Sequence, residues 1–248
     1  MSLQLAAQGA RLTLAARDAA RLEGVASECR SLGARAIAVV TDVADENACR
    51  RMVEAAVGEY GTVDVLVNNA GLSMWARFTE VTDLAPFDQM MRVNYLGSVY
   101  CTHAALPHLL RSRGRIVAVS SLTGRTGVPT RSGYAATKHA MAGFFDSLRI
   151  ELEGSGVTVT VVYPGFVSTE IRERAFGPDG LPLGEGNSPV REREVMTPET
   201  CARLILSAAA SRRRELVMTL RARIGVWLKL FSPRLVDRIA RRAIERGK

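Results

Sequence analysis

The chain has 248 residues, of which 47% are hydrophobic, and this length is sufficient for one α/β domain with a full core. It contains no apolar run that approaches the ~18 residues of a membrane span, and its start lacks the basic and then apolar pattern of a signal peptide. Four scattered cysteines and three histidines show no metal-ligand spacing, so we expect a cytoplasmic protein with reduced cysteines and no metal site.

The formal net charge of +8 is unevenly spread along the chain. Residues 211–248 contain twelve lysines or arginines and three acidic residues, which leaves the first 210 residues close to neutral. The basic character therefore belongs to the C-terminal tail and says nothing about a partner of the main body.

Apolar periodicity predicts strands and helices that alternate along the whole chain. The predicted strands cover residues 11–16, 36–40, 64–68, 116–119, 157–163 and 215–218. The predicted helices cover residues 22–33, 45–57, 84–110, 134–152 and 197–211. This alternation implies an α/β fold, a Rossmann-like doubly wound parallel sheet with helices on both faces. We assign residues 1–210 to this Rossmann-type catalytic domain.

Residues 211–248 are expected to pack on the same domain as its last strand and two basic amphipathic helices. Each helix has an apolar stripe with arginines on the opposite face; the stripes are Leu220, Ile224, Trp227, Leu228 and Phe231, then Leu235, Val236, Ile239, Ala243 and Ile244. The tail could dock on the protein with its basic face in water, or lie on an anionic membrane surface. Nucleic acid is disfavoured, because no recognised nucleic-acid motif accompanies the charge.

The stretch from Ser120 to Lys138 carries the predicted chemistry. Tyr134 and Lys138 are one turn apart on one helix face. A free tyrosine has a pKa of about 10, and a fixed ammonium group nearby would favour its phenolate. Ser121 lies at a strand end, and the glycine-rich loop after it could fold back on the helix. Two hydroxyls would then hold one oxygen that alternates between carbonyl and alcohol, as hydride transfer with a proton relay requires.

Three further motifs surround this stretch: VLVNNAG at residues 65–71, VNYLG around Asn94, and YPGFVST at residues 163–169. With Ser121, Tyr134 and Lys138 they resemble the short-chain dehydrogenase/reductase (SDR) family over about residues 9–169. The resemblance implies that Tyr134 is the acid/base and that Lys138 lowers its pKa and binds the nicotinamide ribose. It also implies that Ser121 holds the substrate oxygen and that Asn94 keeps a water in the proton relay.

The resemblance also implies a set of cofactor-binding residues. Asn69, Ala70 and Gly71 would line the adenosine side, Asp42 and Val43 would meet the adenine, and Pro164, Gly165, Val167 and Thr169 would flank the nicotinamide. As alternatives, Asn69 could cap a strand end, Asp42 could be a turn residue, and Pro164 with Gly165 could be only a turn. Arg17 directly after the first predicted strand favours the 2′-phosphate of NADP(H). Asp18 directly after it keeps NAD(H) as an alternative cofactor, although this carboxylate could instead cap the following helix.

One family feature is expected to be absent from this chain. The family has a strand and a TGxxxGxG turn before the strand at residues 11–16, and only ten residues precede it here. Loss of this central strand would leave two ladders of backbone groups unpaired. We favour a true start upstream of Met1, so that the catalytic domain is N-terminally incomplete; the rival interpretation is a real short form.

The sequence therefore predicts an NADP-dependent oxidoreductase that acts on a moderately hydrophobic ketone or alcohol. Met74, Trp75 and Phe78 would face the substrate beneath a variable lid at residues 171–195. The alternative is a non-catalytic relative that cannot bind the dinucleotide and acts by association. The resemblance further implies a homodimer or homotetramer formed through the helices that bear Asn94 and Tyr134.

Overall fold

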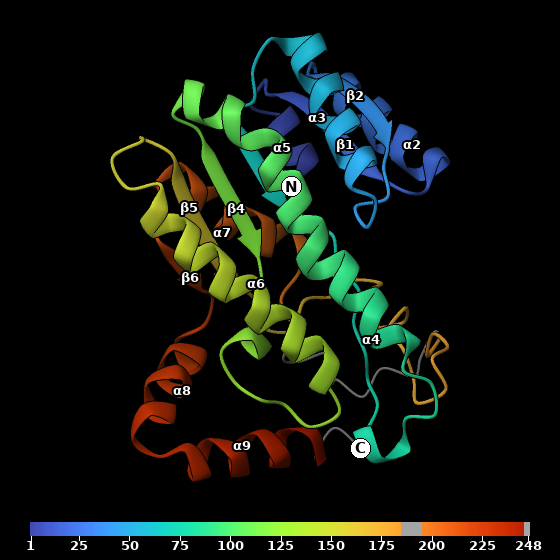
Figure 1. Ribbon diagram of the computed structural model, residues 1–248, viewed down its shortest axis with the longest axis vertical. Helices are drawn as coiled ribbons and strands as arrows, with labels where there is room; N and C mark the ends of the chain where they lie inside the picture. The colour runs from blue at the N-terminus through green and yellow to red at the C-terminus, as the bar shows by residue number, and fades with distance from the viewer. Residues whose placement is uncertain (185–194, 246–248) are drawn as a thin grey trace.

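The strands form two separate parallel sheets in the computed structural model, which describes residues 1–184 and 195–245. One sheet pairs β1 (Arg11–Ala16) with β2 (Arg35–Val40), with Arg11 opposite Arg35. The other has the order β3-β4-β5-β6 and consists of β3 (Val65–Asn68), β4 (Arg115–Val119), β5 (Thr158–Tyr163) and β6 (Glu215–Val217). Figure 1 shows the β1–β2 pair at one end of the molecule, beside the larger sheet.

Helices connect these strands in the predicted alternation, which confirms the α/β, Rossmann-like class. The α-helices are α1 (Ser2–Ala6), α2 (Ala19–Ser31), α3 (Glu46–Tyr60), α4 (Ala85–Met90), α5 (Gly97–Ser112), α6 (Ser132–Glu151), α7 (Pro198–Ala210), α8 (Leu220–Phe231) and α9 (Pro233–Glu245). A π-helical segment, Met91–Leu96, joins α4 to α5, so the long helix predicted over residues 84–110 is one continuous helical segment.

Side-chain caps explain where several helices begin. Asp18 accepts a hydrogen bond of 3.0 Å from the Arg21 backbone N–H at the start of α2, and Asp45 caps α3 in the same way. The predicted Thr197 cap of α7 is confirmed, with Pro198 in its first turn. Such caps satisfy backbone N–H groups that have no partner within the helix.

The core of the larger sheet follows the two-residue period of its strands. Ile116 and Val161 are fully buried on the face covered by α5 and α6, where they pack with Leu109 and Phe145. The intervening residues Val117 and Val162 face α7 and pack with Ile205 and Cys201. Figure 1 shows α6 and α7 on opposite sides of this sheet. β4 and β5 are therefore covered on both faces, as parallel strands require.

The two sheets do not pair with each other. Within residues 1–184 and 195–245, β1 pairs only with β2 and β3 pairs only with β4, so each strand keeps one unpaired edge. The β1–β2 pair has a small core of its own with α1 and α2, made by Ala6, Leu12, Ala26, Cys29, Ala34 and Ala36. Helix α3 contacts both β1 and α5 and so links the two parts.

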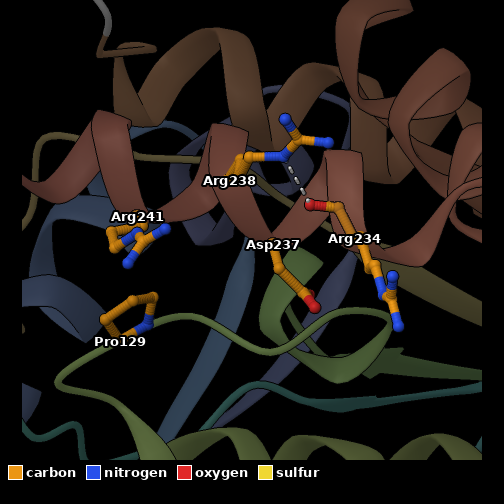
Figure 2. A pocket seen from close by; sticks show the side chains of 5 residues that line it. All are labelled: Pro129, Arg234, Asp237, Arg238 and Arg241. Carbon is orange, nitrogen blue, oxygen red and sulfur yellow. Dashed lines mark hydrogen bonds between the residues drawn. The ribbon is translucent and has the colours of Figure 1, made fainter.

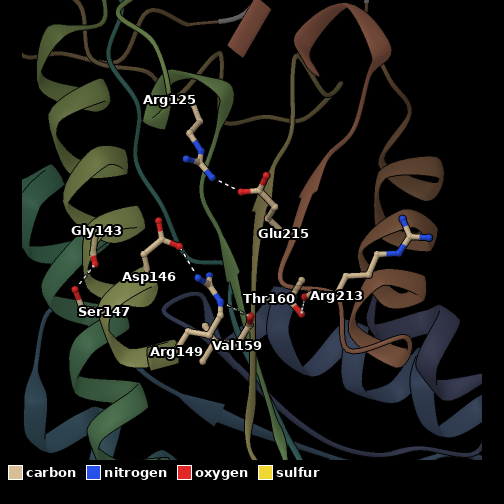
Figure 3. A network of polar contacts seen from close by, with 9 residues as sticks. All are labelled: Arg125, Gly143, Asp146, Ser147, Arg149, Val159, Thr160, Arg213 and Glu215. Atoms are coloured by element: carbon tan, nitrogen blue, oxygen red, sulfur yellow. Dashed lines mark hydrogen bonds and ion pairs between the residues drawn. The ribbon is translucent and has the colours of Figure 1, made fainter. Parts of the chain in front are cut away.

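Polar contacts fasten α6 to β5 and the loop after β4 to β6 (Figure 3). Arg149 of α6 donates to the Val159 carbonyl at 3.2 Å and pairs with Asp146 at 2.7 Å. Arg125 pairs with Glu215 of β6 and lies over the ring of the buried Tyr163, 4.5 Å from its centroid. These contacts fix α6 and the loop after β4 against the sheet.

The tail forms the predicted strand β6 and the helices α8 and α9, which lie at the end of the molecule away from β1 and β2 (Figure 1). Five large apolar side chains of α8 are strongly exposed: Leu220, Ile224, Trp227, Leu230 and Phe231, at 57–83%. Val236 anchors α9, because it is only 8% exposed. No helix in the described part of the chain is long and apolar enough to cross a bilayer.

Candidate active site

The residues predicted to carry the chemistry meet where β4 ends against the first two turns of α6. Tyr134 and Lys138 are 7% and 3% exposed. Lys138 Nζ donates to the Val119 carbonyl at the end of β4 at 2.9 Å, and Ser120 Oγ donates to the Lys138 carbonyl at 3.1 Å. The strand end and the helix are therefore held together by hydrogen bonds in both directions.

Two glycines permit the close packing around this junction. A Cβ on Gly124 would lie 2.8 Å from the Lys138 carbonyl oxygen, and one on Gly133 would lie 2.8 Å from both Met74 Sδ and the Phe87 ring. Real Cβ atoms do not approach other atoms so closely. The glycines thus let the loop after β4 and the start of α6 sit directly on their neighbours.

Several features of its surroundings act on the pKa of Tyr134. Burial raises the pKa of Tyr134, while the nearby Arg131 guanidinium and a hydrogen bond with Ser121 lower it. The Lys138 ammonium lies 5.8 Å from the Tyr134 ring centroid, and burial lowers the pKa of Lys138 itself to about 8. The predicted role of Lys138 in lowering the pKa of Tyr134 stays a prediction, and Arg131 is a second cation beside this tyrosine.

Arg131 is the residue that sequence reasoning missed. It sits three positions before Tyr134 at the N-cap of α6, where its guanidinium lies 5.6 Å from the Tyr134 ring centroid. The available signal was a basic residue one helical turn before the tyrosine. Its burial depends on Trp75 and Phe166, which come from distant segments, so the sequence pattern could not reveal it.

Asn94 is completely buried in the π-helical segment and ties three elements together. Its Oδ1 accepts from the Leu72 N–H at 2.7 Å, while Nδ2 donates to the Leu72 carbonyl at 2.9 Å and to Thr137 Oγ1 at 2.8 Å. π-Helical turns occur often at functional sites. Asn94 therefore fixes the loop after β3 against α6; its predicted water-holding role stays a prediction.

The predicted cofactor residues lie just after the carboxyl ends of the strands. Arg17 follows β1, Asp42 and Val43 follow β2, Asn69 to Gly71 follow β3, and Pro164 to Thr169 follow β5. In open α/β sheets ligands bind outside these ends. Asp18 caps α2, and Arg17 is exposed.

Some of these residues also have structural roles. Asp42 accepts from the Ala44 N–H at 2.9 Å, so the predicted turn alternative is present in the structure. Val43 packs so tightly on Gly97 that a Cβ there would be 2.9 Å away. The Pro164 carbonyl accepts from the Leu122 N–H at 3.0 Å.

One ion pair links the segment after β5 to α2. Glu170 accepts from both Arg21 terminal nitrogens, at 2.7 and 2.9 Å, and also pairs with Arg174. This contact lies one residue after Thr169. It joins the β1–β2 part to the larger sheet on the side where their strands end.

The apolar residues predicted to face the substrate differ in exposure. Met74 is buried, Trp75 is half-buried and Phe78 is 64% exposed. The Trp75 N–H donates to the Phe176 carbonyl at 2.8 Å, so the described part of the predicted lid is held on this loop. Residues 185–194 of that lid lie outside the described residues.

A separate surface pocket of about 440 Å³ lies between α9 and the loop after β4. Its lining consists of Pro129, Asp237 and the three arginines 234, 238 and 241, which Figure 2 shows along one side of α9. Arg238 Nε donates to the Arg234 carbonyl at 3.3 Å. The pocket is a basic surface feature apart from Tyr134. No group of three metal-binding side chains is present in residues 1–184 and 195–245.

Comparison with known proteins gives matches over nearly the whole chain. The family profile described as short chain dehydrogenase matches residues 1–178. This match begins at residue 1 and so does not confirm the expected loss of a strand and glycine-rich turn. The protein named 11-beta-hydroxysteroid dehydrogenase-like 4A from Arabidopsis thaliana is 36% identical over 240 residues, which cover 95% of this chain and 77% of that protein.

Solved structures agree with this relationship. A short chain dehydrogenase/reductase from Burkholderia phymatum, solved in complex with NAD, superposes with a TM-score of 0.81 and 26% identity, over 94% of this chain and 88% of that one. An alcohol dehydrogenase from Thermococcus sibiricus, complexed with 5-hydroxy-NADP, has a TM-score of 0.73 and 26% identity over 87% and 88% of the two chains.

Proposed function

The chain belongs to the short-chain dehydrogenase family, an oxidoreductase family, and from this premise we propose that it is an NADP(H)-dependent enzyme that interconverts a moderately hydrophobic ketone and its alcohol. The observation that carries the proposal is the buried Tyr134 where β4 meets α6, with the Ser121 hydroxyl close enough to lower its pKa. A carbonyl oxygen placed beside both hydroxyls would have a proton donor and a second hydrogen-bond donor within reach.

In this proposal Tyr134 gives its proton to the substrate oxygen during reduction and takes it back during oxidation. Ser121 orients the oxygen, and Arg131 stabilises the phenolate that Tyr134 leaves behind, because its charge lowers the pKa of that hydroxyl. Lys138 uses Nζ to position the end of β4 through the Val119 carbonyl. Asn94 holds the loop after β3 and α6 in register, so the hydroxyls stay aligned.

The described residues fit the ribose end of a nicotinamide dinucleotide, which when bound supplies or accepts the hydride. A Cβ on Gly71 would lie 3.7 Å from Lys138 Nζ and 3.4 Å from Asn94 Oδ1, so the glycine leaves space beside both groups. Lys138 has a donor left after its bonds to Val119 and Met141 and can offer it to a ribose hydroxyl. The exposed Asn69 and Ala70 would line the path of the adenosine.

Arg17 supports the preference for NADP(H). Its side chain is exposed directly after β1, and within the described ranges it makes no ion pair, whereas Asp18 is engaged in capping α2. A free guanidinium at this position suits a 2′-phosphate, which it can bind with two parallel hydrogen bonds. Arg17→Ala should weaken NADPH binding in calorimetry and leave NADH binding unchanged; equal weakening of both would contradict this assignment.

We also propose that the first strand and the TGxxxGxG turn of the family are absent from these 248 residues. The support is that the strands form two separate sheets, in which β1 and β3 each keep an unpaired edge in the described part of the chain. Amide hydrogens of β3 that point away from β4 should then exchange with deuterium much faster than those between β4 and β5. Equally slow exchange at both places would mean that another strand fills the gap.

This gap favours a second candidate, a non-catalytic relative that does not bind the dinucleotide and acts by association. The reductase proposal is tested by NADPH consumption with a panel of aryl and alicyclic ketones. Tyr134→Phe should lower turnover by at least ~10²-fold, because one proton donor is lost, while Tyr100→Phe on α5 serves as the control. If no ketone is reduced by folded protein, the non-catalytic candidate is favoured, whereas a Tyr134→Phe variant that matches the parent rate would contradict the assignment of Tyr134 as the proton donor.

For the tail we propose peripheral contact of a cytoplasmic protein with an anionic membrane surface. The exposed apolar row of α8 ends in Trp227, Leu230 and Phe231, and α9 beside it carries the arginine-lined pocket of Figure 2. Apolar side chains that enter the interface and arginines that meet lipid phosphates together bind such a surface. The parent protein should sediment together with phosphatidylserine vesicles, whereas the double variant Trp227→Ser/Phe231→Ser should stay in the supernatant.

The matched control for this test is Leu84→Ser, which removes a 64% exposed apolar side chain from another part of the surface. Neutral phosphatidylcholine vesicles form the second control, since they lack the negative charge. Equal binding of the parent and the tail variant would contradict membrane contact through α8.

We further propose a homodimer or homotetramer formed through α5 and α6. Both helices expose a large apolar side chain, Leu110 at 42% and Ile150 at 68%. Sedimentation equilibrium should report an oligomer for the parent and a smaller species for Ile150→Glu, and a monomeric parent would contradict the proposal.

A further inference from the structure

Arg131 is a buried cation without an anionic partner. The residue is 8% exposed, and its Nε is fully buried and makes no hydrogen bond in the structure. No carboxylate in residues 1–184 or 195–245 forms an ion pair with it; the ten ion pairs of the described chain all involve other arginines. Burial lowers the pKa of Arg131 to about 10. A buried charge is normally paired, so this arrangement points to a missing counter-ion.

Aromatic rings hold the guanidinium in place. Its Cζ lies 3.8 Å from the Trp75 ring centroid and 5.6 and 5.7 Å from those of Tyr134 and Phe166. Contact with a ring face engages the flat face of a guanidinium, whereas its N–H donors point outward in its own plane. The aromatic contacts therefore orient Arg131 without using its hydrogen-bonding capacity.

A second positive group, Arg172, lies near Arg131. Arg172 is close enough for its charge to oppose that of Arg131, and it is fixed by two hydrogen bonds from Nε and a terminal nitrogen to the Val167 carbonyl, at 3.2 and 2.8 Å. Two like charges held beside an apolar wall repel each other. That repulsion contributes to the lowered pKa of Arg131.

We propose that Arg131 is a carboxylate-binding residue of the substrate site, so that the substrate is an apolar keto acid or the corresponding hydroxy acid. This proposal rests on the proposed reductase function, because it places the substrate carbonyl at Tyr134 and Ser121. A carboxylate fits the planar donors of a guanidinium with two parallel hydrogen bonds. Trp75 and Phe166 give the site an aromatic wall, which suits an apolar or aryl body between the two oxygen-bearing groups.

Binding can be measured without turnover, because Trp75 lies against Arg131. The chain has two tryptophans, so Trp227→Phe leaves Trp75 as the reporter. Titration with a series of aryl keto acids of increasing chain length, each compared with its methyl ester, should quench Trp75 for the acids at lower concentration than for the esters. Loss of one charge-assisted pair predicts roughly a 10- to 100-fold weaker binding of the best acid in Arg131→Met.

Two further variants control this experiment. Arg131→Lys keeps the charge but lacks the planar pair of donors, so it should recover only part of the acid affinity. Arg77→Met removes an exposed arginine near the same loop and should leave the ratio of acid to ester affinity unchanged. Binding of inorganic phosphate in preference to every keto acid, or equal acid affinity in the parent and Arg131→Met, would overturn the proposal.

Turnover separates this inference from the reductase proposal. If ketones are reduced but acids and esters bind and react equally well in the parent, Arg131 does not bind a carboxylate and the reductase function stands. If acids bind through Arg131 but no carbonyl compound is reduced, the reductase function fails and the anion site stands. Since the acid-to-ester comparison uses the parent protein, it remains decisive even where Arg131→Met fails to fold.

Discussion

Replacement of Gly133 by alanine is a sharp test of how α6 is seated. The new Cβ would lie 2.8 Å from Met74 Sδ and from two atoms of the Phe87 ring, and Met74 is only 1% exposed, so its sulfur has little room to move. Overpacking of this kind costs about 1–3 kcal/mol. Alanine recovers up to about 1 kcal/mol through its better helix propensity. The expected net loss of stability is therefore roughly 0.5–2 kcal/mol.

Gly143 on the same helix is the matched control, because a Cβ there has nothing within 4 Å. Gly143→Ala should stabilise the protein by about 0.5–1 kcal/mol, and the two variants should move the thermal midpoint in opposite directions by roughly 2–4 °C per kcal/mol. Gly133→Ala should also lower turnover, since a shift of the first turn displaces Tyr134. If both variants are equally stable, the close contact of α6 with Met74 and Phe87 does not exist in solution.

Two predictions concern protonation. Burial lowers the pKa of Lys138 from 10.5 to about 8, so between these pH values the unfolded state binds more protons and the free energy of unfolding should rise with pH. Measured by urea unfolding across this pH range, the parent should gain about 3 kcal/mol of stability relative to Lys138→Met. Parallel pH curves for the two proteins would contradict this. Arg131 lowers the pKa of Tyr134, so Arg131→Met should move the acidic limb of the pH profile for alcohol oxidation to higher pH, whereas an unmoved limb would show that Arg131 does not act on Tyr134.

Local patterns in the sequence were sufficient to predict the elements of the fold. The run RLTLAA forms β1, and the helices predicted from residues 45 and 197 begin directly after Asp45 and Thr197. These features depend on residues within a few positions of each other. The π-helical turn around Asn94 was not predicted, because its stabilising bonds go to Leu72 and Thr137, which are distant in the sequence.

The spacing of Tyr134 and Lys138 could be predicted from the sequence, whereas the burial of Arg131 beside Tyr134 could not. Spacing along α6 brings Tyr134 and Lys138 to the end of β4, as expected. Arg131 also lowers the pKa of Tyr134, and its position depends on Trp75 and Phe166 from two other loops. A sequence pattern records spacing within one helix, whereas burial and charge proximity arise only when separate segments pack together.

Transfer of deuterium from NADPH labelled at C4 of the nicotinamide to a ketone tests the central claim most directly. The folded protein should form an alcohol with one deuterium on the carbinol carbon, detected by mass spectrometry, from one of the two C4 positions only. Tyr134→Phe should form far less of the same labelled product. Absence of labelled alcohol from folded protein, across aryl ketones and keto acids, would contradict the assignment of this chain as an oxidoreductase that acts on carbonyl compounds.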